Sequence, residues 1–239
     1  MPINVTIWNE FRHEKKIEAA KELYPDGIHA FIKNFIECDD IKVTLAALDD
    51  EEQGLPDSLL NSTDVLIWWG HMAHGEVSDA LVEKVYSRVL GGMGLICLHS
   101  AHASKIFKRT LGSTGTLVWG RNQKCLVWNL APSHPIAEGI PAHFELFEEL
   151  YSEPFAIPKP DDLIFATWYE DGNLFRGGAT FTRGLGKMFY FHPGHETCNS
   201  FYNENVQKII KNAVIWCAPA KVGEGCALTA CPKQSEPLV

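Results

Sequence analysis

Histidine is the residue type whose placement in this sequence most clearly indicates chemistry. Seven of the ten histidines lie within a few residues after apolar, β-branched runs that are typical of strands. They fall in four segments, residues 9–14, 70–76, 99–102 and 192–196. The carboxyl ends of parallel strands meet at one edge of a sheet, where ligands bind. We therefore expect a single crevice around His13, His71, His74, His99, His102, His192 and His195.

Imidazole and carboxylate groups at one crevice can do two kinds of chemistry. Three protein ligands and an open position form a catalytic zinc site, and imidazole also suits iron or nickel. Without a metal, the same groups act as general acids and bases near neutral pH. The sequence has no HExxH, HxH or CxxC motif, so the ligands of a metal would come from separate loops. Our expected ligands for a divalent metal, zinc first, are His71, His99 and His192.

Nucleophilic catalysis is a third option, because residues 94–101 form a strand that enters a turn. A nucleophile elbow lies at such a place, although the sequence has no GxSxG motif. Ser100 is the candidate nucleophile at this turn. Cys97 lies inside the apolar strand, where we expect a buried and inert thiol.

The order of elements predicts an α/β fold. Apolar or alternating runs predict strands at residues 3–8, 42–48, 64–69 and 95–99, and helical spacing is found between them at 14–36, 56–60 and 78–90. This alternation is typical of a doubly wound parallel sheet. The second half predicts strands at 125–128, 163–169, 177–183 and 187–191, with a hairpin turn at 184–186 and a closing helix at 203–217. We expect one domain over residues 1–219 and a loose tail at 220–239.

Composition and charge exclude several classes of protein. The 239 residues carry a net charge of −9 and no long Lys/Arg run, which argues against nucleic-acid binding. No apolar stretch reaches the length of a membrane helix, and the first residues do not resemble a secretory signal, so we expect a cytoplasmic protein. The seven cysteines include no CxxC pair, which favours reduced thiols. Apolar residues in the second half predict a homo-oligomer.

Two family resemblances follow from these motifs. Residues 191–196, Phe-His-Pro-Gly-His-Glu, resemble the segment that carries the catalytic His and Glu of class I glutamine amidotransferases. The turn after the predicted strand at residues 95–99 corresponds to the position of their nucleophilic cysteine. This turn has no cysteine, so we expect no glutaminase activity. The sequence is more similar to the ThuA-like (trehalose utilisation) family, through residues 5–14, 69–71, 94–102, 148–151 and 189–196.

The ThuA-like resemblance implies a fold, a metabolic role and a set of site residues. The implied fold is a flavodoxin-like three-layer α/β sandwich with a mostly parallel central sheet. The implied role is in the metabolism of a disaccharide or another sugar, with 3-keto sugars as one class. Glu149 enters only through the family's Glu-x-Tyr pattern. The residues carried over by position are Glu10, His13, His71, His99, His102, Glu149, His192, His195 and Glu196.

Our first hypothesis is an enzyme that acts on a small-molecule sugar. His195 and Glu196 serve as base and orienting carboxylate, and the other catalytic candidates are Glu10, His13, His102 and Glu149. The alternative is a sugar-binding or regulatory module without catalysis. We interpret Trp8, Trp68, Trp69 and Trp119 as core residues in preference to sugar-stacking ones. We interpret His29, His134 and His143 as structural.

Overall fold

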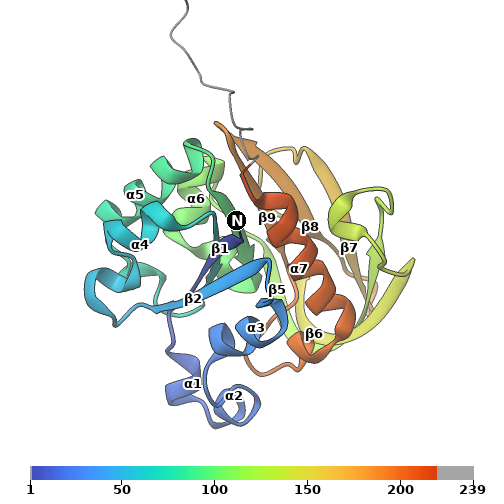
Figure 1. The fold of residues 1–239 in the computed structure, drawn as a ribbon. Helices are drawn as coiled ribbons and strands as arrows, with labels where there is room; N and C mark the ends of the chain where they lie inside the picture. Colours follow the sequence, from blue (N-terminus) through green and yellow to red (C-terminus); the bar gives the residue numbers. More distant parts are fainter. Residues whose placement is uncertain (1, 220–239) are drawn as a thin grey trace, which may run out of the picture.

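A nine-stranded sheet with helices on both faces forms the body of the protein (Figure 1), seen in a computed structural model that describes residues 2–219. The strands are β1 Ile3–Asn9, β2 Ile41–Ala47, β3 Val65–Trp69, β4 Gly94–Leu98, β5 Val118–Asn129, β6 His143–Ser152, β7 Asp162–Tyr169, β8 Leu174–Arg183 and β9 Gly186–Phe191. The helices are α1 His13–Lys16, α2 Glu18–Leu23, α3 Ile28–Ile36, α4 Asp57–Ser62, α5 Asp79–Leu90, α6 Lys105–Leu111 and α7 Glu204–Cys217. The α/β class is confirmed.

The sheet is mixed, so the expectation of a mostly parallel sheet is wrong. Its order is β2-β1-β3-β4-β9-β8-β7-β5-β6. The strands from β2 to β9 pair in parallel, whereas those from β9 to β6 pair antiparallel, and the antiparallel ladders hold more residue pairs. Short turns join β7 to β8 and β8 to β9, so each of these strands returns antiparallel to the one before it. β9 is the strand at which the two halves join.

Helices cover the parallel half on both faces. On one face α3 and α7 pack together, against β1 and β2 and against β4 and β9 respectively (Figure 1). α5 packs between α4 and α6. Ser78 Oγ accepts the Leu81 N–H at the start of α5, and Asn203 caps α7 by accepting the Asn205 N–H. The covering helices explain why β3 and β4 are buried along their whole length.

Strand β6 was not predicted from the sequence, although it carries the expected site residue Glu149. Its sequence, HFELFEELYS, is rich in Glu and Leu, which favour helices. The side chains alternate between buried and exposed up to Phe147, as in a strand with one covered face, and pairing with β5 overrides the local preference. The expected tail, residues 220–239, lies outside the described residues.

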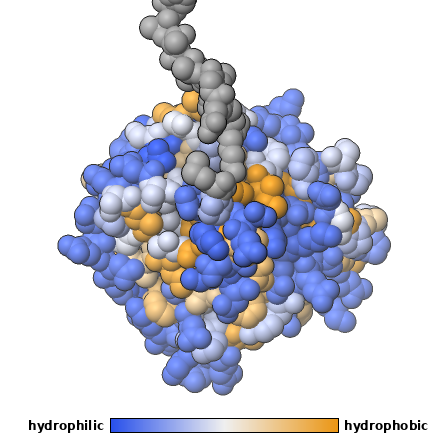
Figure 2. Space-filling view, in the orientation of Figure 1, coloured by the Kyte–Doolittle hydropathy of each residue, from blue (hydrophilic) through white to orange (hydrophobic). Residues whose placement is uncertain are grey.

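Hydrophilic residues dominate one face of the described part of the chain (Figure 2). None of its helices has the length and apolar composition needed to cross a membrane. Hydrophilic residues cover most of the face in Figure 2, with smaller apolar areas between them. Within residues 2–219 the cysteines are free, and four of the five are buried: Cys97, Cys125, Cys198 and Cys217.

Candidate functional site

Four loops at the carboxyl ends of β1, β3, β4 and β9 bring their histidines together. The ring of His71 is the centre of this cluster. Its centroid lies 4.7 Å from that of His13, 5.8 Å from that of His99 and 5.5 Å from that of His195. His99 and His195 are 5.3 Å apart. The loops converge because parallel strands deliver their carboxyl ends to one edge.

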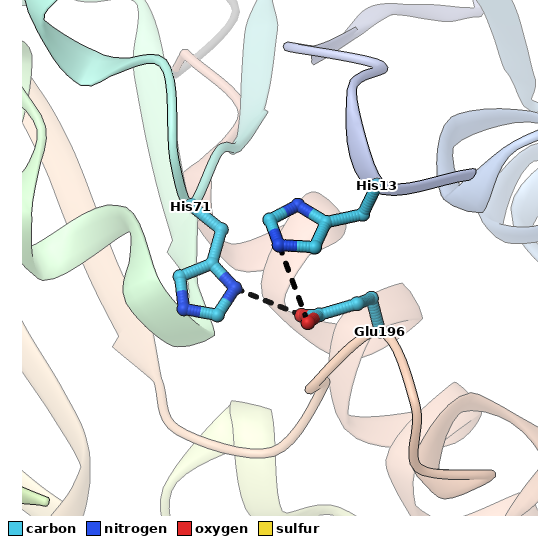
Figure 3. A group of neighbouring side chains, drawn as sticks. All are labelled: His13, His71 and Glu196. Atoms are coloured by element: carbon cyan, nitrogen blue, oxygen red, sulfur yellow. Dashed lines mark hydrogen bonds and ion pairs between the residues drawn. The ribbon is translucent and has the colours of Figure 1, made fainter. Parts of the chain in front are cut away.

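Three donor atoms converge in the first of two groups, formed by His13, His71 and Glu196 and called the His13 group below (Figure 3). His13 Nε2 lies 3.4 Å from Glu196 Oε1, and His71 Nδ1 lies 2.9 Å from Glu196 Oε2. Figure 3 shows both rings pointing at the carboxylate. Burial opposes the charge of Glu196, but the hydrogen bond from His71 and the neighbouring imidazoles lower its pKa to about 2. A carboxylate therefore faces two ring nitrogens.

Glu10 stands behind the His13 group. Its carboxylate accepts the Met72 N–H at 2.8 Å and the Ala73 N–H at 2.9 Å, which fixes the loop that carries His71. Burial opposes the charge of Glu10, but the neighbouring His13 ring and the backbone N–H groups of Met72 and Ala73 lower its pKa. His13 Nδ1 lies 3.6 Å from Glu10 Oε1 and is a buried nitrogen without a hydrogen-bond partner in the described residues. A proton on Nδ1 toward Glu10 leaves the unshared pair of Nε2 facing Glu196.

This arrangement fits a divalent metal. Bonds of 2.0–2.2 Å at tetrahedral angles separate two ligand atoms by about 3.4 Å, close to the distance from His13 Nε2 to Glu196. A carboxylate that orients a ligating imidazole through its other nitrogen is the usual outer support of such sites. Glu10 has that position relative to His13. The donor set is two imidazoles and one carboxylate, a combination that zinc accepts.

The second group consists of His99, Glu149 and His195 and is called the His99 group. His99 Nδ1 donates to the carbonyl of His192 at 2.9 Å, and its Nε2 lies 3.2 Å from Glu149 Oε2. Burial opposes a positive charge on His99, but the hydrogen bond to Glu149 and the nearby carboxylate charges raise its pKa. Burial also opposes the charge of Glu149, yet His99 lowers its pKa. The pair is thus an imidazolium and a carboxylate.

His195 holds its proton on the nitrogen that faces the carboxylates. The backbone N–H of Thr197 donates to His195 Nδ1 at 3.2 Å, so this nitrogen acts as an acceptor. The neutral ring then carries its proton on Nε2, 3.4 Å from Glu196 Oε1 and 4.0 Å from Glu149 Oε1. Burial lowers the pKa of His195, which favours this neutral form. Binding of a metal here would first have to remove this proton, as it would at His71 Nδ1, which donates to Glu196.

His192 lies outside both groups, so the structure does not bring the three expected metal ligands together as one donor set. It is fully buried, and its Nε2 donates to the carbonyl of Glu149 at 3.1 Å. Thr167 Oγ1 lies 3.5 Å from its Nδ1. Burial lowers the pKa of His192 well below its ordinary value. The neutral imidazole of His192 has protein partners on both sides and links the end of β9 to β6, which is a structural role.

A cavity of about 220 Å³ opens beside the two groups. His71 of the His13 group and Glu149 of the His99 group both line this cavity. His74 and His102, which belong to neither group, line it as well. Burial lowers the pKa of His74 to about 4 and that of His102 to about 3, so both are neutral. Its lining residues are His71, His74, Ser100, His102, Ala103, Trp119, Glu149 and Tyr151.

The elbow after β4 carries a histidine where a nucleophile would stand. His99 is the first residue of this turn and has a φ of 49°, a conformation that non-glycine residues rarely adopt. Ser100 is buried, and its hydroxyl donates to the carbonyl of Gly70 at 2.7 Å rather than to an imidazole. Cys97 is fully buried, and burial raises the pKa of its thiol far above the ordinary value. These contacts do not favour nucleophilic catalysis.

Glu148 is the site residue that sequence reasoning missed. It is fully buried on β6 and accepts the Gly194 N–H at 2.7 Å, the His195 N–H at 3.2 Å and the Ser200 hydroxyl at 2.6 Å. These bonds fix the loop that carries His195 and Glu196. Two adjacent glutamates in a strand point to opposite faces, so recognition of β6 would have placed one of them on each side.

The remaining histidines and tryptophans divide as follows. His29 is buried beside Asn9, and His134 Nδ1 accepts the Ile136 N–H, so both have structural contacts; His143 packs near Trp128. Three of the four singled-out tryptophans, Trp8, Trp68 and Trp69, are core residues, whereas Trp119 is 72% exposed and lines the cavity.

Solved structures with similar folds cover nearly the whole chain. A putative ThuA-like protein from Parabacteroides merdae has a TM-score of 0.69 at 14% identity, with 94% of each chain covered. A cytoplasmic protein from Salmonella typhimurium has a TM-score of 0.64 at 11% identity, over 90% of this chain and 100% of that one.

The family of this chain is identified from its sequence. No curated protein matches it. A family model described as trehalose utilisation matches residues 4–217, which include every residue of the His13 and His99 groups. The chain therefore belongs to the ThuA family.

Proposed function

We propose that this protein is an enzyme of sugar metabolism that transfers protons on a sugar bound in the cavity, with a divalent metal in the His13 group. The observation that carries the proposal is the convergence of two His/Glu groups from four loops beside one cavity. The family's description, trehalose utilisation, supports a sugar as the substrate class. The chain has no nucleophile at its elbow, so we expect no glutaminase activity.

Glu149 is the proton-transfer residue in this proposal, since its carboxylate lines the cavity and lies against His99. It exchanges a proton with a hydroxyl or a carbon-bound hydrogen of the sugar. The fully buried His99 keeps a proton on Nε2 at the other side of that carboxylate, and His195 presents a second Nε2–H. General acid–base transfer of this kind contributes about 10²–10⁴-fold to a rate.

The residues that would hold the metal are His13 through Nε2, His71 through Nδ1 and Glu196. This set replaces the one expected from the sequence. When bound, the metal would polarise an oxygen of the substrate. His71 connects the two functions because it belongs to the His13 group and also lines the cavity. Zinc is the first candidate because the ligands are two imidazoles and a carboxylate.

Elemental analysis of the purified, untagged protein tests the metal. We expect about one equivalent of zinc in the unaltered protein and less than a tenth of an equivalent in Glu196→Gln. Glu149→Gln is the matched control, since it alters the neighbouring group by the same isosteric change and is expected to retain the metal. No metal in the unaltered protein, including after incubation with zinc, would contradict a metal-assisted mechanism.

A second candidate function is a sugar-binding module without catalysis. The Ser100 hydroxyl donates to the Gly70 carbonyl, and the thiol of Cys97 is inert, so neither is available as a nucleophile at the elbow. This favours a binding module. The two functions differ in one measurement. An enzyme converts a bound sugar in a reaction that Glu149→Gln abolishes, whereas a binding module shows saturable binding and no product.

A further inference from the structure

Trp119 is the exposed tryptophan among the four that the sequence singled out. Its exposed fraction is 72%, whereas Trp8, Trp68 and Trp69 are exposed by 1% or less. It lies on β5 directly across from Tyr151 on β6, and both side chains line the cavity. The register of the two strands shifts between Gly120 and Asn122, next to Trp119. Bulges of this kind re-aim side chains next to functional sites.

We propose that Trp119 is the platform of a subsite for one unphosphorylated pyranose ring, whose apolar face stacks on the indole. This inference rests on the proposed function and names its substrate more closely. An exposed tryptophan costs hydrophobic free energy, which a stacked ligand recovers by covering the ring. The apolar C–H face of a pyranose is flat enough to cover an indole.

The size of the cavity limits what fits beside Trp119. Its volume of about 220 Å³ equals the share of liquid volume of about seven water molecules. That space accommodates one sugar ring and not two. Because Trp119 is largely open to solvent, a second ring of a disaccharide would extend past it into water.

The charge of the cavity excludes phosphorylated sugars. None of the eight lining residues is Lys or Arg, and Glu149 contributes a negative charge. His74 and His102 are held neutral by burial, so they do not supply a cation near pH 7. In the protein without metal, a phosphate brought into this site would meet the Glu149 carboxylate and no Lys or Arg of the lining, which is unfavourable.

The polar groups of the cavity match hydroxyls instead. His102 Nδ1 donates to the carbonyl of Gly115 at 2.7 Å, which leaves Nε2 as an acceptor. Glu149 is a second acceptor, and the hydroxyl of Tyr151 can donate. Sugar hydroxyls are donors and acceptors at once, so a ring with several of them satisfies both kinds of partner.

Isothermal titration calorimetry with four probes tests the inference: trehalose, methyl α-glucopyranoside, methyl α-galactopyranoside and glucose 6-phosphate. We expect at least one neutral pyranoside to bind, and the phosphate to bind at least tenfold more weakly to the chelated protein. Trp119→Ala should weaken that binding about tenfold, the value of one aromatic contact. Trp119→Phe should retain most of it. Trp168→Ala, a tryptophan that is 50% exposed on β7 and does not line the cavity, is the matched control.

Each outcome decides the inference. Equal binding by Trp119→Ala, tighter binding of the phosphate, or no binding of any probe at millimolar concentration would overturn it. The titrations are run on zinc-loaded and on chelated protein, with the metal content measured separately. Trp119-dependent binding without metal or turnover would sustain the subsite and contradict the proposed enzyme. Metal binding and turnover, together with sugar binding that does not depend on Trp119, would support the proposed enzyme and contradict the subsite.

Discussion

The His13 group and the His99 group contain the same residue types, two histidines and one glutamate, yet they hold their protons in opposite places. In the His13 group, Glu10 lies behind His13 Nδ1, so the unshared pair of Nε2 faces the carboxylate. In the His99 group, the Thr197 N–H leaves the proton of His195 on Nε2, and the positively charged His99 also carries a proton on the Nε2 that faces Glu149. An unshared pair that faces a carboxylate suits a cation, whereas two protons that face one suit proton transfer.

This difference shows that residue type and proximity do not by themselves assign a function to a histidine. The deciding contact is on the far nitrogen of each ring, where a carboxylate, a carbonyl or an amide fixes the position of the proton. For His195 that contact is the N–H of Thr197, only two residues further along the chain. A substitution of the group that contacts the far nitrogen should therefore alter the function of a histidine as much as a substitution of the residue that faces its other nitrogen.

Substitution of Glu196 is expected to have the largest effect. Glu196→Gln removes the charge that faces both His13 and His71, so it should lose the metal and lower turnover of the bound sugar by at least 10²–10⁴-fold. Metal content and steady-state kinetics check both parts. A variant that retains a full equivalent of metal would show that the His13 group is not the metal site.

Glu149→Gln should separate the two groups. We expect turnover of the bound sugar to fall about 10²–10⁴-fold while the metal content stays near one equivalent, because Glu149 contacts only the His99 group. The measurement is kcat together with elemental analysis of the same preparation. Loss of metal here would mean that the two groups act as one site and would break the comparison.

Glu10→Gln should weaken metal binding about 10–100-fold, the usual effect of altering a residue that orients a ligand. The amide oxygen can still accept one of the two loop N–H groups of Met72 and Ala73, but its NH2 then faces the other, so thermal unfolding is measured alongside to check that the fold is retained. Competition titration with a chromophoric chelator measures the affinity. Glu153→Gln, which alters a partly buried carboxylate paired with Arg176, is the control and should leave the affinity unchanged. Equal effects of the two variants would count against an orienting role for Glu10.

The smallest expected effect is a pH dependence of stability from His102, which lines the cavity outside both groups. Its pKa is about 3 when folded, below the value of 6.5 for a free imidazole, so the unfolded chain binds the proton more readily. Stability from this residue is present above pH 6.5 and is lost as the pH falls toward 3. Between pH 7 and pH 5 the loss is up to about 2 kcal/mol.

Urea unfolding of the chelated protein at several pH values measures this dependence without a contribution from the metal. His102→Gln should show a shallower decline of the unfolding free energy between pH 7 and pH 5 than the unaltered protein. Parallel declines would show that His102 is protonated as easily in the folded protein as in the unfolded chain.

The sequence was sufficient to predict the parallel half and the loops that carry the histidines, because buried parallel strands are continuous apolar runs with clear ends. It was not sufficient for the antiparallel half, where the Glu- and Leu-rich β6 resembles a helix. The role of Glu148 was missed for the same reason. The contacts of His192 could not be predicted, because the Glu149 carbonyl and the Thr167 hydroxyl near its ring come from strands distant in the sequence.

The position of β9 in the sheet has a consequence for synthesis on the ribosome. β9 lies between β4 and β8 and is followed directly by the loop with His195 and Glu196, whereas His13 is made near the start of the chain. A nascent chain therefore exposes the open edge of β4 and contains neither complete group until its last strand has emerged. Under the proposed function, metal binding and catalysis require closure of the sheet, so an incomplete translation product should remain inert toward both zinc and sugar.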